Sequence, residues 1–242
     1  MDAGAGFQSE HSIRAVLNGC LEEMVDALFA EQVLDADKIG WTKASLTDIA
    51  AYKNGLAMQK FRPVESDPGL PVLKIRELGQ GYCAPDAERC STKIPEEVKV
   101  HDGDLIFSWS GTLLLKFWSG GDAGLNQHLF KVTSTGYEKW FYYLWTKHHM
   151  RRFIAMAADR ATTMGHIKRS ALEKSEVYIP PASEMNELSK IFGPLVEAMV
   201  DNDIENKRLA SLRDALLPKL MSGEIDVSEV DITQPNSRLC EC

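Results

Sequence analysis

The chain has 242 residues, of which 44% are hydrophobic and 26% are charged, as in ordinary globular domains. No apolar run approaches the roughly 18 residues needed to cross a bilayer, and the first residues lack the basic start and apolar core of a signal peptide. These features predict a cytoplasmic protein with no membrane partner. The net charge of −8 argues against a nucleic-acid partner, except that residues 139–174 carry eight Lys or Arg and only two Asp or Glu.

The first predicted element is a short amphipathic helix over residues 9–33. Its apolar side chains recur at spacings of three and four, with acidic residues on the opposite face. Such a helix must dock on another element, and the long C-terminal helix described below is the obvious candidate. A polar linker at 34–40 then marks a domain boundary, so that residues 1–38 form an N-terminal helical segment.

Residues 39–182 have the pattern of a sheet-rich domain, because short apolar runs alternate with turn residues. The runs predicted as strands are SLTDIA (45–50), LPVLKIREL (70–78), VKV (98–100), DLIFSWSG (104–111), LLLKFW (113–118) and LNQHLFKVT (125–133). Residues 137–158 predict a helix and 159–170 a polar loop, after which LEKSEVYIP (172–180) returns to a strand. The sequence therefore predicts a mixed or antiparallel sheet with helices, an α/β (α+β) fold.

One long helix is predicted within residues 183–227. With Ser183 as its N-cap and Ser222-Gly223 as its stop, it would run roughly 55 Å at 1.5 Å per residue, longer than a small domain is wide. Gly193-Pro194 should kink or restart this helix, because proline has no N–H for the helical hydrogen bond. The sequence predicts a spacer arm, followed by a poorly ordered tail at 228–242.

An apolar seam along this helix predicts a coiled-coil-like pairing with another helix. The seam residues recur at alternating spacings of three and four, and an asparagine in such a seam commonly fixes register and partner number. The residues predicted to face the partner are Leu188, Ile191, Leu195, Asn202, Leu209, Leu212 and Leu216. The alternative is a surface helix that covers its own domain.

Motifs for catalysis or cofactor binding are absent: the sequence has no Walker or Rossmann glycine loop, GxSxG, HExxH or CxxC. Two weak alternatives remain open. The loose spacing of a magnesium-dependent nuclease core is matched by Asp86, Glu97 and Lys99. A zinc site without a fourth ligand could be built from Cys83, Cys90 and His101. The sequence favours a protein that is not an enzyme, with reduced cysteines, no metal and no cofactor of its own.

Residue types that read base edges gather in predicted turns, most of them around the basic block. Arg and Lys read guanine, Asn and Gln read adenine, and the threonine methyl meets thymine. The residues predicted to contact DNA are Lys74, Arg76, Ser108, Trp109, Ser110, Asn126, Gln127, His128, Arg151, Arg152, Thr162, Thr163, His166, Lys168 and Arg169. Lys74 and Arg76 are expected on a strand that leads to a glycine-rich loop. The His148-His149 pair, which has no ligand partner at a suitable spacing, is expected to pack or to contact phosphate.

With these residues in view, the chain resembles the specificity subunit of type I restriction–modification systems. The segments that carry the resemblance are GDLIFSWSG (103–111), LNQHLFKV (125–132), TTMGHIKR (162–169) and VYIPP…LLPKLMSGEIDV (177–227). The resemblance covers Trp41 to Val227, and its last segment is the most specific. Family members usually hold two target recognition domains and two helical regions, whereas this chain has one of each.

The resemblance implies that residues 39–182 form an α/β target recognition domain that reads one half of a bipartite site in double-stranded DNA. Long helices of the two halves would pack antiparallel and set the distance between half-sites. The chain itself would have no catalytic role. Its partners would be methyltransferase subunits, which use S-adenosylmethionine, and a restriction/translocase subunit.

Because the chain has half the usual family length, we expect two copies to pair through residues 184–221, with help from 9–30. Such a homodimer would mimic a full-length subunit. The alternatives are pairing with a different half-subunit, a truncated remnant, and a scaffold that does not contact DNA.

Overall fold

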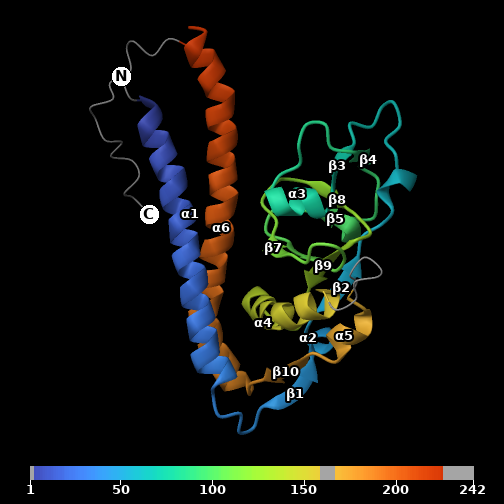
Figure 1. Cartoon of the computed structure of the whole chain (residues 1–242), viewed down its shortest axis with the longest axis vertical. Helices are drawn as coiled ribbons and strands as arrows, with labels where there is room; N and C mark the ends of the chain where they lie inside the picture. The colour runs from blue at the N-terminus through green and yellow to red at the C-terminus, as the bar shows by residue number, and fades with distance from the viewer. Residues whose placement is uncertain (1–2, 159–166, 226–242) are drawn as a thin grey trace.

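The computed structural model describes residues 3–158 and 167–225. Two long helices form an arm, and the strands and remaining helices form a globular domain beside it (Figure 1). This arrangement confirms the predicted α/β fold with a long C-terminal helix. Within the described ranges, no helix is both long and apolar enough to cross a membrane.

The arm consists of α1 (Ala3–Phe29) and α6 (Ala182–Met221), which run antiparallel and side by side (Figure 1). α1 continues into one π-helical turn, η1 (Ala30–Leu34). α1 packs on α6, and the two helices are joined by a hydrogen bond between Asn202 and Asn18. The N-terminal helix is not short, however, because α1 has 27 residues.

α6 runs without interruption through its 40 residues, so the predicted restart at Gly193-Pro194 is wrong. Pro194 lies on the exposed face of α6, where water can replace the lost helical hydrogen bond, while Phe192 and Val196 are buried on the opposite face. The predicted N-cap is also wrong, since Pro181 takes that position and makes no side-chain cap. The predicted stop is confirmed by the C-cap Ser222 and by Gly223, whose φ is +73°.

The globular domain contains three small sheets. A two-stranded antiparallel sheet closes the domain at the base of the arm and pairs β1 (Thr42–Ser45) with β10 (Glu176–Ile179). The second sheet is antiparallel and has the order β2 (Ala51–Asn54), β9 (Leu129–Thr133), β6 (Leu105–Ser108), β7 (Leu115–Phe117). The third sheet is mixed, with β3 parallel to β8, and has the order β4 (Arg89–Cys90), β3 (Leu70–Leu73), β8 (Ala123–Leu125), β5 (Lys99–Val100).

The helices of the globular domain are mostly short. They are α2 (Leu46–Ile49), α3 (Ile75–Gln80), α4 (Lys139–Ala158) and α5 (Arg169–Glu173), together with the 3-10 turns η2 (Met58–Lys60) and η3 (Glu96–Val98). Two of the predicted strands are therefore partly helical. SLTDIA forms α2 because Ser45 and Asp48 close a capping box around its first turn. LPVLKIREL changes from strand to helix after Lys74, and Gly81 ends α3 in the left-handed conformation.

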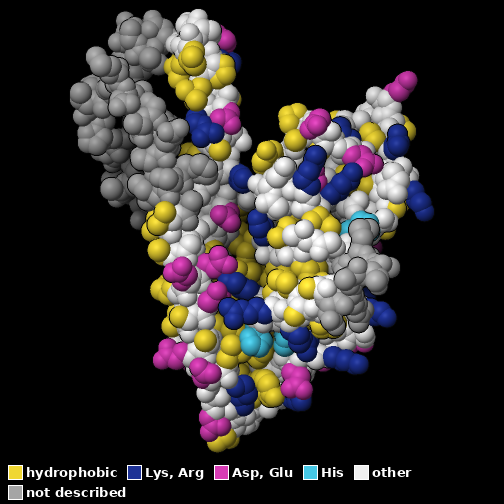
Figure 2. Space-filling view, in the orientation of Figure 1, with side chains coloured by type: hydrophobic (Ala, Val, Ile, Leu, Met, Phe, Trp, Pro, Cys, Tyr) yellow, Lys and Arg dark blue, Asp and Glu magenta, His cyan; other side chains and the backbone are white. Residues whose placement is uncertain are grey.

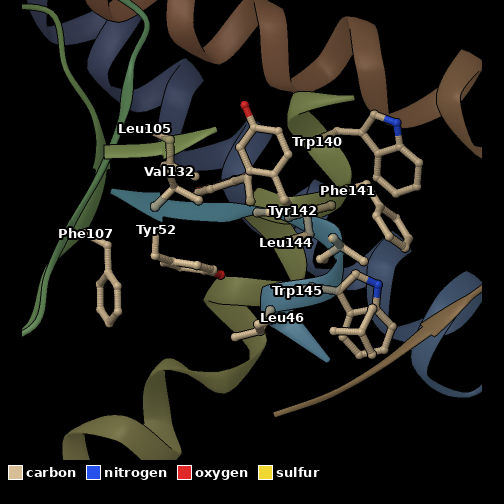
Figure 3. Close-up of a cluster of buried hydrophobic side chains, with 14 of the residues drawn as sticks. Leu46, Tyr52, Leu105, Phe107, Val132, Trp140, Phe141, Tyr142, Leu144 and Trp145 are labelled. Atoms are coloured by element: carbon tan, nitrogen blue, oxygen red, sulfur yellow. The ribbon is translucent and has the colours of Figure 1, made fainter. Parts of the chain in front are cut away.

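Aromatic residues of α4 join the sheets to the arm. Figure 3 shows α4 side chains, among them Trp140, Phe141 and Trp145, packed near strand residues. The ring of Trp140 stacks on Phe192 of α6 at 4.9 Å between centroids, and Trp145 meets Phe29 of α1 at 5.4 Å. Burial of such large rings contributes several kcal/mol each on the scale of core truncations, roughly 3–5 kcal/mol. The base of the arm and the globular domain therefore share one core.

A second core lies around the mixed sheet and the inner face of α3. Its members are apolar side chains that are all buried: Met58, Val72, Leu73, Leu78, Cys90, Ile94, Val98, Val100, Ile106, Trp118, Ala123, Leu125 and Leu129. This core holds the ends of β3 and β8 in place. The turns that follow these two strands are thus mounted on a packed support.

Candidate nucleic-acid interface

Three of the segments predicted to contact DNA meet at one end of the antiparallel sheet. The backbone N–H of Trp109, after β6, donates to the carbonyl of His128 in the β8–β9 turn at 3.4 Å, and Ile167 N–H donates to the Trp109 carbonyl at 2.9 Å. Ser110 Oγ lies 3.1 Å from His128 Nδ1. We call the side chains of Asn54, Trp109, Gln127 and His128 the loop cluster.

A glycine allows these loops to approach one another. Gly55 follows β2, and a β-carbon at this position would lie 2.2 Å from the carbonyl oxygen of Leu125 and 2.3 Å from that of Asn126. The Gly55 N–H donates to Leu129 O at 3.0 Å, which ties the end of β2 to the β8–β9 turn. No larger residue fits here without movement of the backbone.

Trp109 and Asn54 form a direct hydrogen bond across the end of the sheet. The indole Nε1–H of Trp109 donates to Asn54 Oδ1 at 3.0 Å, and the Trp109 ring lies 5.9 Å from the ring of His128 and 5.8 Å from that of Phe130. Sequence reasoning missed Asn54. The available signal was its place directly before Gly55, at the end of a strand where a turn begins.

A shallow cleft of about 350 Å³ opens beside the loop cluster, lined by Asn54, Trp109, Phe130, Ile167, Lys168 and Arg169. Lys168 and Arg169 are exposed, and within the described ranges neither has an ion-pair partner. Apolar walls with two cations at the rim suit a ligand that carries flat rings and negative charge. A nucleic-acid strand has both.

Ser108 does not reach this surface, and its prediction as a base-reading residue is wrong. Its side chain has 0% exposure, and its hydroxyl donates to the carbonyls of Ser110 at 3.2 Å and Thr112 at 2.8 Å. These bonds shape the turn that presents Trp109. Ser108 is thus a structural residue of the loop. Ser110 is also buried, with 3% exposure and a contact to His128, so its prediction as a base-reading residue is wrong as well.

Lys74 and Arg76 are already paired within the chain. Lys74 Nζ lies 2.7 Å from Glu88, and Arg76 bonds through Nε and Nη2 to Oε1 of the buried Glu77. Lys74 also occupies the N-cap position of α3, without a side-chain hydrogen bond to the helix, and does not lie on a strand as predicted. Contact with DNA would have to compete with these two ion pairs.

The basic block does not form one DNA-facing patch, because several of its cations serve the fold. Lys147 pairs with Glu22 and Asp26 of α1, both at 2.7–2.8 Å. Arg152 hydrogen bonds to Ser175 Oγ and to the Ala171 carbonyl. Figure 2 shows Lys and Arg side chains spread over this face of the molecule.

Of the predicted cations, Arg151, Lys168 and Arg169 stay exposed and form neither an ion pair nor a side-chain hydrogen bond in the part of the chain that the structure describes. The predicted contacts Thr162, Thr163 and His166 lie outside the described residues. The candidate interface therefore consists of the loop cluster and the two cations beside it, Lys168 and Arg169.

His148 and His149 carry little positive charge at neutral pH. Burial lowers the pKa of His149 to about 4, and the ring nitrogen Nε2 lies 2.8 Å from the Glu176 carbonyl. Burial also lowers the pKa of His148. Of the two expectations for this pair, packing fits His149, which lies against Trp145 and Phe153.

The nuclease and zinc alternatives find no support in the geometry. Glu97 pairs with Lys53 at 2.6 Å, whereas Lys99 pairs with Glu96 at 2.9 Å. His101 lies between Asp122 and Glu96, at 2.7 and 2.9 Å. Among the described residues, no group of three or more His, Cys, Asp or Glu side chains is arranged to hold a metal ion.

The seam predicted to face a partner is partly used within the chain. Leu188 is buried in the shared core, and Asn202 Nδ2 donates to Asn18 Oδ1 of α1 at 2.9 Å. The prediction that these two residues face a second copy is therefore wrong. Leu195 and Leu209 are half-buried, while the exposed members of the seam are Ile191, Leu212 and Leu216.

Comparison with known proteins identifies the family. The profile of the type I restriction modification DNA specificity domain matches residues 38–213. The chain belongs to this family. The match spans the strands of the globular domain and most of α6, so the type I specificity domain includes the loop cluster and the α6 part of the arm.

Two relatives are named as specificity subunits of type I restriction enzymes. The chain is 34% identical over 192 residues to the type I restriction enzyme HindI specificity subunit of Haemophilus influenzae, covering 77% of this chain and 42% of that protein. It is 23% identical over 205 residues to the MjaIX specificity subunit of Methanocaldococcus jannaschii, covering 79% of this chain and 46% of that protein. The chain thus spans less than half the length of these relatives.

A solved structure shares the fold. The type I restriction–modification S subunit from M. genitalium superposes with a TM-score of 0.54 at 15% identity, covering 89% of this chain and 56% of that one. At this identity the likeness concerns the fold alone.

Proposed function

We propose that this chain reads one half of a bipartite sequence in double-stranded DNA for a type I restriction–modification complex. The observation that carries the proposal is the loop cluster, where polar and aromatic side chains gather beside Lys168 and Arg169 on a rigid sheet end. Phosphate contacts from the cations would position the domain, and the loop side chains would read the bases.

The chain supplies recognition and leaves the chemistry to partners. We propose that methyltransferase subunits, which hold S-adenosylmethionine, dock on this chain in the cytoplasm, and that a restriction/translocase subunit joins them. Membership in the specificity family supports this division of labour. The described residues also lack any cluster suited to hold a metal.

We further propose that two copies pair through the arm. Near the end of α6 the side chains of Leu212, Leu216 and Leu220 are 52%, 36% and 37% exposed, and Figure 2 shows hydrophobic side chains gathered there. A row of exposed apolar side chains at helical spacing favours burial against another helix. A twofold pair would present two recognition domains and would read a palindromic, gapped site.

The test of DNA recognition is a pair of charge-removing variants, Lys168→Ala and Arg169→Ala. Each should weaken binding of the full chain to duplex DNA for all sequences alike. Each should also reduce the slope of log affinity against log salt by about one, because one phosphate contact is lost. Binding is measured by fluorescence anisotropy at several salt concentrations.

Lys190→Ala is the matched control, since Lys190 is an exposed lysine on α6 that pairs with Glu187 at 2.7 Å. It should leave both affinity and salt slope unchanged. Equal behaviour of all three variants would contradict the proposed interface. Absence of DNA binding by the unaltered chain, alone and with its methyltransferase subunit, would favour the scaffold alternative.

A further inference from the structure

The amide of Asn54 has a fixed orientation. An indole N–H only donates, so the bond from Trp109 Nε1 at 3.0 Å requires the amide oxygen of Asn54 to face the tryptophan. The amide nitrogen then points away from Trp109 with two donor hydrogens. Within the described ranges, no hydrogen bond to this nitrogen is formed, and Asn54 is exposed.

Both residues of this pair are held by their surroundings. Asn54 is the last residue of β2 and pairs with Phe130 of β9, and the next residue, Gly55, is fixed to Leu129 by a backbone hydrogen bond. Trp109 exchanges backbone hydrogen bonds with both His128 and Ile167. A side chain held in this way loses little freedom on binding and presents its donors at a defined place.

The donors of Asn54 lie at the cleft whose rim carries Lys168 and Arg169. Cations that contact phosphates bring a base edge within reach of a neighbouring side chain. In the major groove, guanine offers O6 and N7, adenine N7 and thymine O4 as acceptors, whereas cytosine offers only the N4 donor. An amide that presents its nitrogen there discriminates against cytosine.

We propose that Asn54 is a specificity-determining residue that donates a hydrogen bond to an acceptor on one base of the half-site, and that Trp109 is the residue that positions it. This inference rests on the proposed function, since it assumes that the cleft meets duplex DNA. It assigns a hydrogen-bonding role to Asn54 and predicts that one position of the recognised half-site is any base except cytosine.

The test measures the base preference at each position of the half-site. The full chain, purified with its methyltransferase subunit, selects from a library of duplexes with randomised half-sites, and the bound duplexes are sequenced. Cytosine should be excluded at one position. Asn54→Ala should reduce the discrimination at this position about tenfold and leave the other positions unchanged.

Two further variants separate a hydrogen-bonding role from a merely structural one. Asn54→Asp keeps an oxygen for Trp109 but cannot donate, so the preference at this position should shift toward cytosine or adenine, which carry amino groups in the major groove. Trp109→Phe keeps the ring but loses Nε1–H, so it should weaken discrimination at the same position as Asn54→Ala. The double variant should be no worse than Asn54→Ala.

Asn186→Asp is the charge-matched control, because Asn186 is exposed on α6 at the base of the arm. It should leave every position unchanged. Unaltered preferences in both Asn54 variants, with normal selectivity of the parent chain, would overturn the inference and leave the proposed function standing. If the parent chain selects no sequence at all, the proposed function itself fails.

Discussion

At the scale of single residues, the loop cluster is possible because one position carries no side chain. Gly55 brings the end of β2 against the carbonyl groups of Leu125 and Asn126, and the neighbours that a β-carbon would meet are backbone atoms. The carbonyl groups of this turn cannot move aside as a flexible side chain could, because β8 and β9 on either side of it are each held in a sheet. The close approach in turn places Asn54 within reach of Trp109.

We expect Gly55→Ala to destabilise the protein by about 1–3 kcal/mol, as other overpacked sites do. It should also reduce sequence-specific DNA binding, because the β8–β9 turn must move. Urea unfolding and duplex binding measure the two effects.

Gly136→Ala is the matched control, since a β-carbon at residue 136 would have no neighbour within 4 Å. This change should alter the unfolding free energy by less than about 0.5 kcal/mol. Equal stability of the two variants would show that the β8–β9 turn moves easily and that the loop cluster is not rigid.

The sequence predicted the loops of this site better than the side chains that compose it. Turn residues and strand ends indicated that 108–110 and 126–128 lie where strands end, because these signals are local. Whether Ser108 points inward, or Asn54 meets Trp109 from 55 residues away, depends on strand pairing that no local pattern contains. Arg152 and Lys147 likewise have partners within the chain, Ser175 and Glu22, which the basic pattern of the sequence does not indicate.

At the scale of elements, the arm is held in register by polar side chains inside an otherwise apolar contact. Asn18 Nδ2 of α1 donates to the Met199 carbonyl at 3.1 Å and to Asp203 Oδ1 at 2.7 Å, and Asn18 Oδ1 accepts from Asn202. Shifting α1 along α6 would break all three bonds. The sequence predicted that Asn202 fixes a register, but the helix it meets is α1 of the same chain.

We expect Asn18→Ala to destabilise the arm by about 1–3 kcal/mol, because Asn202 and the Met199 carbonyl lose their partner in a half-buried contact. Amide hydrogen exchange should accelerate in residues 16–29 and 199–206. The globular strands, whose core does not include Asn18, should exchange as before.

Asn186→Ala supplies the control, because this exposed asparagine lies on α6 near the base of the arm. Its exchange pattern should match that of the parent chain. If Asn18→Ala were equally silent, the arm would be held by its apolar contacts alone and the asparagines would not determine its register.

At the scale of the whole molecule, the arm has two kinds of surface. The base of α6 is buried against α1 and α4, where Phe192 stacks on Trp140 and Leu188 joins the core. Farther along, Leu212, Leu216 and Leu220 are left exposed. Periodicity alone predicted a single seam that faces one partner. A sequence pattern does not show that one end of a helix packs on its own domain while the other end is left for a second chain.

We expect the double substitution Leu212→Glu and Leu216→Glu to convert a dimer into a monomer, because four new carboxylates would face one another across the twofold contact. Light scattering at micromolar concentration measures the mass. The matched control is Ile39→Glu with Val64→Glu, two apolar residues that are 81% and 62% exposed away from this end of α6. The control should remain dimeric, and a monomeric parent chain would contradict the pairing.

The symmetry of the assembly also determines the sequence that it methylates. A twofold dimer holds two identical loop clusters, so base-resolution sequencing of cells that express the chain with its partner subunits should show adenine methylation at one palindromic, gapped motif. The motif should disappear in the Leu212→Glu, Leu216→Glu variant and persist in the control, because recognition of each half-site alone is too weak.

An asymmetric gapped motif would instead mean that a different half-subunit supplies the second recognition domain. In that case the exposed end of α6 would be a heterodimer surface, and the homodimer proposal would be wrong while the proposed role in DNA recognition would stand.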